Sequence, residues 1–396
     1  MLRQPGLFQQ PSAATGRAGI DGSLWEGCFN AKENSIHQLS PYVGKMKSGM
    51  ARALIEEFTR EGDVVLDPFC GSGVVPLEAL LCGRHAIGND LNPYAYVLTM
   101  GKLSAPATHA EATARALQSL EQAADEKVSV DEVPAWVRAF FHPQTLQEAV
   151  ALASVLKRRR EYFLLACLLG ILHHVRPGFL SYPASHLVPY LRIKKYPPAA
   201  YPDLYCYRPV RPRFLAKIAR AYRRFEPPRP DLNRVVLHEN AMSLPLADNS
   251  VDAVISSPPY YGALDYGRDN RLRLWFLGVE DYREIDAGLT SSERVYVPQM
   301  TLALGEMLRL LKPGKCAVLV LGDYHRDGRR RDSASTLAET VRSLYHRCAS
   351  AEKLLVDEIP DARRARRRTQ TTKHETILLI RKLARNPAGE ARPAAG

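Results

Sequence analysis

The apolar positions in the first part of the chain alternate between helical and strand-like spacing. Over residues 46–58 they recur at helical spacing, and a short apolar run over residues 64–67 then predicts a buried strand. After a glycine-rich turn, residues 74–82 again show helical spacing, with Gly83 as the predicted C-terminal cap. A second strand is predicted over residues 85–88. This strand–loop–helix–strand unit is typical of the start of a parallel α/β sheet.

The pattern changes in the middle of the chain. Residues 104–127 and 143–176 show helical spacing, whereas residues 177–230 are rich in Pro, Tyr and Arg and have little periodicity. We therefore expect residues 104–232 to form a mainly helical, basic insertion that interrupts the sheet.

The α/β pattern resumes after this insertion. The further predicted elements are strands over residues 234–237, 252–256 and 316–321, a helix over residues 295–311, and a hairpin of strands over residues 354–358 and 375–379. The predicted organisation is a mobile N-terminus (1–24), one sheet domain in two parts (25–103 and 233–385), the insertion (104–232) and a flexible tail (386–396).

Composition narrows the class of protein. Of the 396 residues, 46% are hydrophobic and 24% are charged, which is typical of a globular protein. The longest apolar run, residues 162–172, is too short to cross a membrane, and the N-terminus has no apolar signal core. Seven cysteines without a CxxC pair indicate neither a disulfide framework nor a zinc site. We therefore expect a cytoplasmic protein with no membrane contact and no metal.

Positive charge is concentrated in two stretches. The formal net charge is +12, and residues 191–230 hold eleven basic and two acidic residues. Residues 363–373 hold six basic residues and no acidic one. Arg outnumbers Lys, and the planar guanidinium of Arg matches phosphate oxygens. The distribution predicts a polyanionic partner, with a solvated Arg-rich surface as the alternative.

The glycine-rich turn after the first strand has the sequence DPFCGSG, residues 67–73. Glycines let the backbone turn tightly and approach a ligand closely. Asp90 follows the second strand, where a carboxylate can accept hydrogen bonds from ribose hydroxyls. The turn is neither the GxGxxG fingerprint nor a P-loop, so a nucleoside cofactor without phosphates, such as S-adenosylmethionine, fits it better. A plain turn between strand and helix is the alternative.

A second candidate motif, SPPY at residues 257–260, follows a predicted strand. Pro258 and Pro259 lack an N–H, which leaves their carbonyls as hydrogen-bond acceptors. Ser257 offers a hydroxyl, and Tyr260 offers a flat ring for a base. These groups suit an exocyclic amine whose lone pair is turned toward a methyl donor, a transfer that depends on alignment and electrostatics. A strand-ending turn is the alternative.

Together the two motifs resemble motifs I and IV of the S-adenosylmethionine-dependent DNA amino-methyltransferases. In that family SPPY is typical of the cytosine-N4 members and DPPY of the adenine-N6 members. The resemblance covers about residues 30–103 and 233–382. It implies an α/β fold with a Rossmann-like seven-stranded sheet whose last strand is antiparallel, and S-adenosyl-L-methionine as the cofactor.

The resemblance also implies roles for individual residues. Residues 37–55 are similar to motif X, and Asn240 stands at the cofactor-adenine position, where Asp is more usual. The implied catalytic residues are Ser257, Pro258, Pro259 and Tyr260. The implied cofactor-binding residues are Asp67, Phe69, Gly71, Gly73, Asp90, Asn240, Tyr42 and Lys45.

The implied substrate is double-stranded DNA. The insertion lies between the cofactor and catalytic motifs, where the family has its target-recognition region, so we expect it to grip the duplex. The target, N4 of a cytosine, would be flipped out of the stack onto Tyr260. The expected nucleic-acid-binding residues are Arg211, Arg213, Arg268, Arg363, Arg364, Arg366, Arg367 and Arg368. A cognate restriction endonuclease as partner and a solitary methylase are both compatible with this assignment.

Three alternatives stay open at the level of the sequence. The first is the same chemistry on adenine N6, and the second is an RNA methyltransferase acting on a tRNA guanine amine. The third is an inactive nucleic-acid-binding protein on a methyltransferase scaffold, although the intact glycines, Asp90 and SPPY argue against it.

Overall fold

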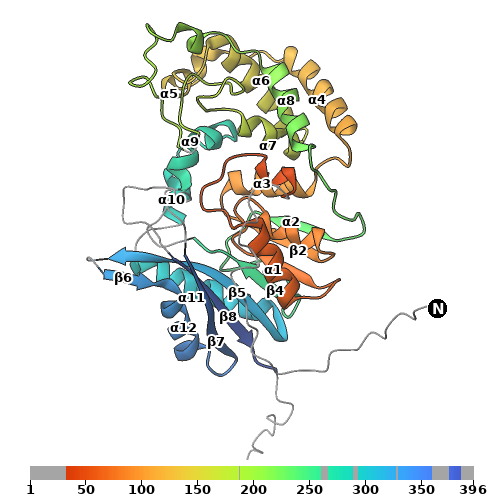
Figure 1. Cartoon of the computed structure of the whole chain (residues 1–396), viewed down its shortest axis with the longest axis vertical. Helices are drawn as coiled ribbons and strands as arrows, with labels where there is room; N and C mark the ends of the chain where they lie inside the picture. Colours follow the sequence, from red (N-terminus) through yellow and green to blue (C-terminus); the bar gives the residue numbers. More distant parts are fainter. Residues whose placement is uncertain are drawn as a thin grey trace, which may run out of the picture.

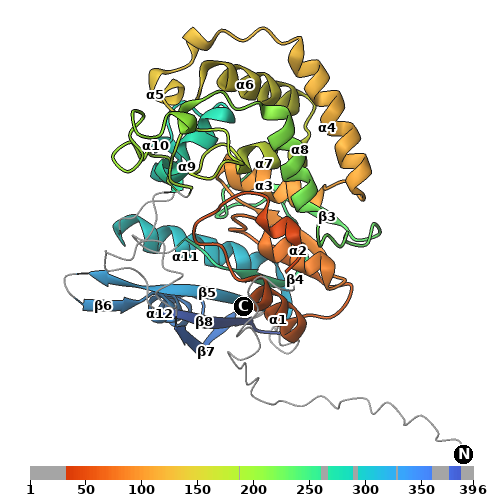
Figure 2. The same cartoon turned by 45° about the horizontal axis from the view of Figure 1, so that its top comes forward.

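A sheet and a layer of helices make up the molecule. The computed structural model describes residues 33–186, 188–259, 266–288, 293–326, 329–358 and 374–384. The sheet lies at one end and the helical layer at the other, with α3 (Pro93–Leu103) and α9 (Tyr266–Phe276) between them (Figure 1). Figure 2 shows the same two parts with the helical layer brought forward.

The sheet has the strand order β3-β2-β1-β4-β5-β8-β7. Strands β1 to β5 pair in parallel, whereas β8 is antiparallel to both β5 and β7. The strands are β1 (Val64–Asp67), β2 (His85–Asn89), β3 (Arg234–Leu237), β4 (Val251–Ser256), β5 (Leu311–Arg326), β7 (Ala349–Glu358) and β8 (His374–Lys382). The predicted Rossmann-like sheet with an antiparallel last strand is confirmed. A short additional strand, β6 (Arg329–Asp332), pairs with the end of β5 and was not predicted.

The two faces of the sheet are covered by different helices. Side chains alternate along β5, where Val318 and Val320 join one apolar cluster and Leu319 and Leu321 join the other, as the two-residue period of a strand requires. The first cluster includes α1 (Ser48–Phe58) and α2 (Val74–Leu81), and the second includes α11 (Glu293–Leu310) and α12 (Ser333–Leu344). A sheet buried on both faces explains why these strands are continuously apolar.

The helical layer is built mainly from the predicted insertion. Its helices are α4 (His109–Ala124), η3 (Val130–Glu132), α5 (Ala135–Arg138), α6 (Pro143–Arg158), α7 (Tyr162–Gly170), η4 (Pro202–Tyr205) and α8 (Val210–Ala221), with α10 (Arg283–Gly288) following α9. Helix α7 packs closely on α3, since a Cβ added to Gly101 would lie 2.9 Å from the carbonyl oxygen of Tyr162. The apolar residues of this layer form one continuous cluster with the α1/α2 face of the sheet.

One arginine counted in the basic stretch 191–230 does not contribute to the surface. Arg208 is only 3% exposed, and its guanidinium donates hydrogen bonds to the carbonyls of Phe179 (3.2 Å), Leu204 (2.9 Å) and Ser181. Arg208 is therefore a structural residue and is not available to a polyanion. None of the helices in the described part of the chain combines the length and hydrophobicity that a membrane crossing requires.

Candidate active site

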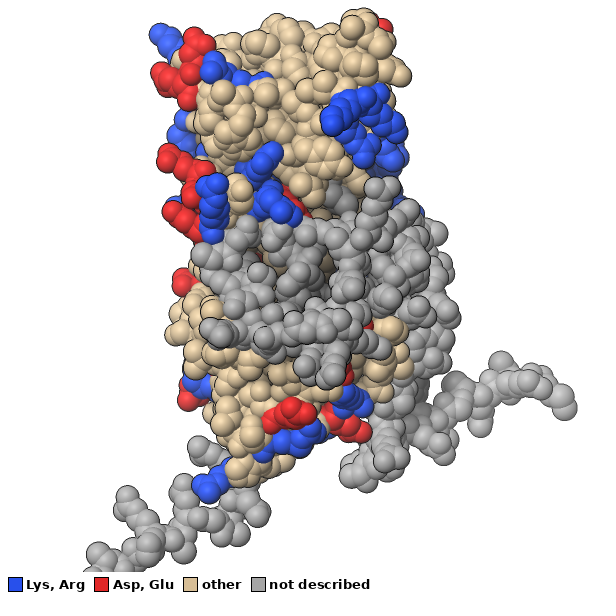
Figure 3. All heavy atoms as spheres, turned by 90° about the vertical axis from the view of Figure 1, so that its left-hand side faces the viewer, with Lys and Arg blue, Asp and Glu red and all other residues tan. Residues whose placement is uncertain are grey.

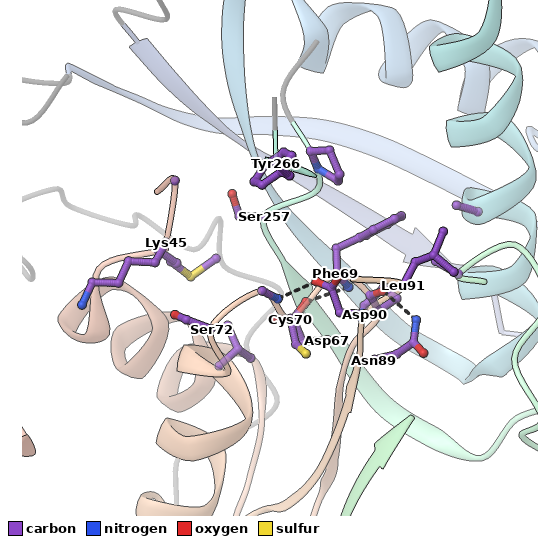
Figure 4. Close-up of a pocket in the computed structure, with 18 of the residues that line it drawn as sticks. Lys45, Asp67, Phe69, Cys70, Ser72, Asn89, Asp90, Leu91, Ser257 and Tyr266 are labelled. Carbon is purple, nitrogen blue, oxygen red and sulfur yellow. Dashed lines mark hydrogen bonds between the residues drawn. The ribbon is translucent and has the colours of Figure 1, made fainter. Parts of the chain in front are cut away.

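A pocket opens where β1, β2 and β4 end. Parallel strands bring their carboxyl ends to one edge of a sheet, and both candidate motifs follow such ends. The predicted residues that line it are Tyr42, Lys45, Asp67, Phe69, Gly71, Asp90, Asn240, Ser257 and Pro259. Figure 4 shows the glycine-rich turn with Asp67 and Asp90 on one side, and Ser257 and Tyr266 across from them.

The glycines shape the turn below this pocket. Gly71 and Gly73 have φ angles of 50° and 70°, which side chains disfavour. A Cβ on Gly73 would also lie 2.7 Å from Thr99 Oγ1, so Gly73 closes the turn against α3 without lining the pocket. A Cβ on Gly71 would lie 3.1 Å from Tyr42 Cε1, which places the Tyr42 ring directly over the turn.

Asp90 is held in place by backbone N–H groups. Its Oδ2 accepts a hydrogen bond from Gly71 N at 2.8 Å, and its Oδ1 accepts one from Asn92 N at 2.9 Å. Burial raises the pKa of the Asp90 carboxyl to about 6, against the lowering effect of these two bonds. The carboxylate retains further lone pairs for a ligand hydroxyl.

Asp67 connects the two motifs. Its Oδ1 accepts a hydrogen bond from the Ser256 hydroxyl at 2.6 Å and one from Phe69 N at 3.2 Å. Burial raises the pKa of Asp67 to about 7, while the Ser256 hydrogen bond opposes that rise. Ser256 is the residue before SPPY, so this bond fixes the second motif to the first. Sequence reasoning did not identify it.

Three tyrosine rings lie near one another at the pocket, and two of them, Tyr42 and Tyr266, line it. The Tyr42 ring lies 5.8 Å from that of Tyr94 and 6.2 Å from that of Tyr266. Tyr266, the first residue of α9, lines the pocket, whereas Pro258 is buried and does not. Tyr260 lies outside the described residues.

Lys45 and Asn240 occupy opposite parts of the lining. Lys45 Nζ donates a hydrogen bond to the carbonyl of His37 at 3.3 Å, which holds the amine beside the pocket. Asn240 Oδ1 accepts from Met242 N at 3.0 Å, and its amide nitrogen is the part that remains for a ligand. The segment that resembles motif X thus contributes Tyr42 and Lys45 to the pocket lining.

Other lining residues come from elements that carried no motif. Tyr296, Gln299 and Met300 lie on one face of α11, and an i, i+3, i+4 pattern by itself indicates only a helix face.

Ser72 lies within the glycine-rich turn, and its buried hydroxyl has no hydrogen-bond partner among the described residues. An unpartnered polar atom in the lining suits a site that takes a polar ligand.

Cys70 lies in the glycine-rich turn, and its thiol is buried. Burial raises the pKa of the Cys70 thiol well above its ordinary value, and its Sγ lies 3.3 Å from Thr99 Oγ1, which suits the packing role expected of it. Within the described ranges no group of His, Cys, Asp and Glu side chains is arranged to hold a metal ion.

The predicted DNA-binding arginines are scattered in the structure. Arg268 follows Tyr266 on α9 and is 46% exposed, with its Nε 3.6 Å from Asp269. Arg211 is exposed on α8, whereas Arg213 donates hydrogen bonds to the carbonyls of Pro177 and Pro209. The remaining predictions, Arg363, Arg364, Arg366, Arg367 and Arg368, lie outside the described residues.

Comparison with known proteins bears directly on the first motif. The model of the DNA methylase family matches residues 21–100, which contain the glycine-rich turn and Asp90. The resemblance to the DNA amino-methyltransferases is confirmed for this part of the chain. With it, S-adenosylmethionine is confirmed as the cofactor that this fold is built to bind.

Individual relatives extend the match beyond that segment. The Type II methyltransferase M.BsoBI of Geobacillus stearothermophilus is 24% identical over 275 residues, which are 63% of this chain and 54% of that protein. A tRNA (guanine(10)-N2)-dimethyltransferase of Methanocaldococcus jannaschii is 44% identical over 52 residues, 13% of this chain and 15% of the relative. The chain thus spans about half the length of the first relative and far less of the second.

A solved structure gives only a distant likeness. The putative rRNA methylase of Clostridium thermocellum aligns over 85% of this chain and 96% of its own, with a TM-score of 0.34 and 10% identity. The fold assignment therefore rests on the strand order and pairing described above.

Proposed function

We propose that the protein is an S-adenosylmethionine-dependent DNA methyltransferase that modifies the exocyclic N4 amine of a cytosine flipped out of the duplex. The observation that carries this proposal is the joint pocket. Ser257 and Pro259 of SPPY line the same cavity as Asp67, Gly71 and Asp90 of the cofactor motif. A methyl donor and an acceptor amine held in one cavity are at the short range that direct transfer needs.

The cofactor half would be held by groups already fixed in position. Asp90 would accept hydrogen bonds from the ribose hydroxyls, and the Asn240 amide would contact the adenine. Lys45 is the cation at the rim, where a carboxylate of the cofactor would be stabilised. When bound, the cofactor supplies a methyl group on a sulfonium and leaves as a neutral thioether.

The amine half would be oriented by acceptors. The Ser257 hydroxyl and the carbonyls of Pro258 and Pro259 can accept N–H hydrogen bonds and so direct the lone pair of the amine toward the methyl group. The amine gains the methyl carbon and releases one proton to water. The bond between Ser256 and Asp67 would keep Ser257 in register with the cofactor, because a small misplacement of reacting atoms is costly.

The substrate base is assigned from the serine of SPPY. The family model that matches residues 21–100 is described as a DNA methylase, which favours DNA as the substrate of this chain. The tRNA dimethyltransferase relative favours a second candidate, a guanine amine in tRNA, although that match covers only 13% of the chain.

Nucleoside mass spectrometry of DNA and tRNA would test the proposal. The samples come from a host expressing the protein or its Ser257→Ala variant, with Ser250→Ala as a control serine outside the pocket. We expect N4-methylcytosine in DNA with the wild type and the control, and at least about 100-fold less with Ser257→Ala. N6-methyladenine would overturn the base assignment, and a methylated guanine confined to tRNA would overturn the assignment to DNA.

A further inference from the structure

A long acid-free segment lies in the helical layer and is bonded to helix α9, which begins at the pocket. Residues 162–202 contain no Asp or Glu, although the chain has 42 acidic residues. The part after α7 carries Arg176, Arg192, Lys194 and Lys195. Its yellow-green trace lies on the left of the helical layer in Figure 1, the side that Figure 3 turns toward the viewer. On that side Lys and Arg side chains gather in patches over the helical layer.

Helix α9 ties this segment to the rim of the pocket. Arg273 donates hydrogen bonds to the carbonyl of Leu169 (3.3 Å) and to that of His186 (3.1 Å). Arg271 donates to the carbonyl of Pro189 at 3.0 Å. Helix α9 begins at Tyr266, which lines the pocket, so these bonds join the segment to the helix that enters the pocket lining.

Arg273 of α9 also contacts residues next to the proposed cofactor site. Arg273 is 1% exposed, and its guanidinium lies over the Tyr94 ring at 5.4 Å. The Tyr94 hydroxyl donates to the carbonyl of Pro41 at 2.7 Å, and Tyr42 follows directly. Arg273 therefore connects the backbone of the segment to the tyrosine rings that lie over the glycine-rich turn.

The basic residues of this segment differ from those on the outer helices. On α4 and α6, Arg115 pairs with Glu111 and Arg158 pairs with Glu126, each at 2.5 Å. Among the described residues no carboxylate lies within ion-pair distance of Arg176, Arg192, Lys194 or Lys195. A polyanion can therefore bind these cations without breaking an existing ion pair, which makes them the stronger site.

Ring side chains accompany these cations. The rings of His174 and His186 lie 4.8 Å apart, and the backbone N–H groups of Val175 and Arg176 donate to His174 Nδ1, which leaves Nε2–H as a donor. Tyr190 is 50% exposed. Cations beside exposed flat rings are the composition of surfaces that bind phosphate and stack on bases.

We propose that residues 171–186 and 188–196 form the surface that grips duplex DNA beside the extruded base, with Arg176 and Arg192 on backbone phosphates. The proposal rests on the proposed function. It places the main DNA grip here rather than at Arg213, whose guanidinium is already bonded to the carbonyls of Pro177 and Pro209.

A matched pair of double variants tests this surface in the full chain. Arg176→Gln with Arg192→Gln removes two cations of the segment, and Arg115→Gln with Arg158→Gln removes two from the outer helices. Binding of a sheared genomic duplex is measured between 50 and 200 mM salt. We expect the segment variant to bind about 10-fold more weakly at the higher salt and its log–log salt slope to fall by about 2, with the control unchanged.

Two further measurements distinguish a failure of the proposed DNA-binding surface from a failure of the proposed function. Affinity for S-adenosylhomocysteine should be equal in the wild type and both variants, which shows that each is folded with an intact pocket. An unchanged salt slope in the segment variant, or an equal loss in the control, would overturn the proposed surface. Failure of the wild type to methylate DNA would instead overturn the proposed function, and preferential binding of tRNA over the duplex would overturn DNA as the occupant.

Discussion

In both the pocket and the acid-free segment, burial shifts the pKa of ionisable groups toward the neutral form, upward for the acids and downward for the histidines. In the pocket, burial raises the pKa of Asp67 to about 7 and that of Asp90 to about 6. In the segment, burial and then neighbouring cations lower the pKa of His174 to about 4 and also lower that of His186.

This difference teaches which ligand each region favours. Buried carboxylates gain from a ligand that donates hydrogen bonds or brings positive charge, as the hydroxyls and sulfonium of the proposed cofactor would. Histidines beside Arg176, Arg192 and Arg273 gain from an anion, as a phosphate would be. The two regions therefore suit two ligands of opposite charge.

Replacing the carboxylate at the ribose position should have the largest effect on the pocket. Asp90→Asn removes the negative charge and one acceptor oxygen, and we expect affinity for S-adenosylhomocysteine to fall about 100-fold, or about 2.7 kcal/mol. Isothermal titration calorimetry measures it. Asp125→Asn, at the exposed end of α4, is the control and should change nothing. Equal affinity in Asp90→Asn would remove Asp90 from the cofactor site.

The pH dependence of binding should have opposite signs in the two regions. Ionised Asp90 accepts hydroxyl hydrogen bonds, so affinity for S-adenosylhomocysteine should rise about 10-fold from pH 5 to pH 7 and then level off, since the pKa of Asp90 in the free protein is about 6. A bound phosphate favours protonated His186, so affinity for the duplex should rise as the pH falls. Calorimetry and fluorescence anisotropy over this range give both slopes.

The two pH slopes have separate controls. Asp90→Asn should flatten the cofactor profile near pH 6 and leave the DNA profile as it was. His186→Gln should flatten the DNA profile, because His174, Arg176, Arg192 and Arg273, which surround it, keep their charge states. Burial, and next the neighbouring His186, Arg176 and Arg192, lower the pKa of His174 to about 4, so His174 stays neutral over this range. Slopes of the same sign in the wild type would contradict the comparison.

Removing the hydrogen bond between Ser256 and Asp67, which joins the two motifs, should have the smallest of these effects. Ser256→Ala removes the hydroxyl that donates to Asp67, and we expect the free energy of unfolding to fall by about 1 kcal/mol. The pKa of Asp67 should rise further, since the hydrogen bond lowers it. Urea denaturation measures the stability change. Ser250→Ala is the matched control, because that buried hydroxyl has no partner in the described structure, and an equal loss there would show that the bond contributes nothing.

Sequence reasoning went furthest where a functional group lies close along the chain to the element that carries it. The strand, the glycine-rich turn and helix α2 are consecutive, and Asp90 follows the adjacent strand, so local pattern and parallel pairing together placed Asp67, Gly71 and Asp90 at one edge. The hairpin of β7 and β8 was likewise visible in its apolar runs.

The sequence by itself determined the order of strands and helices, the two motifs, and the excess of positive charge, since each depends on neighbouring residues or on composition. Only the tertiary structure decided that Ser256 bonds to Asp67 across 189 positions, and that α11 adds Gln299 to the lining. The tertiary structure also decided which basic side chains are available to bind a polyanion. Arg208 and Arg273 are buried against carbonyls of distant loops, whereas Arg192 is not. Whether an arginine finds such carbonyls or meets solvent depends on contacts between remote segments, which no local pattern of residues records.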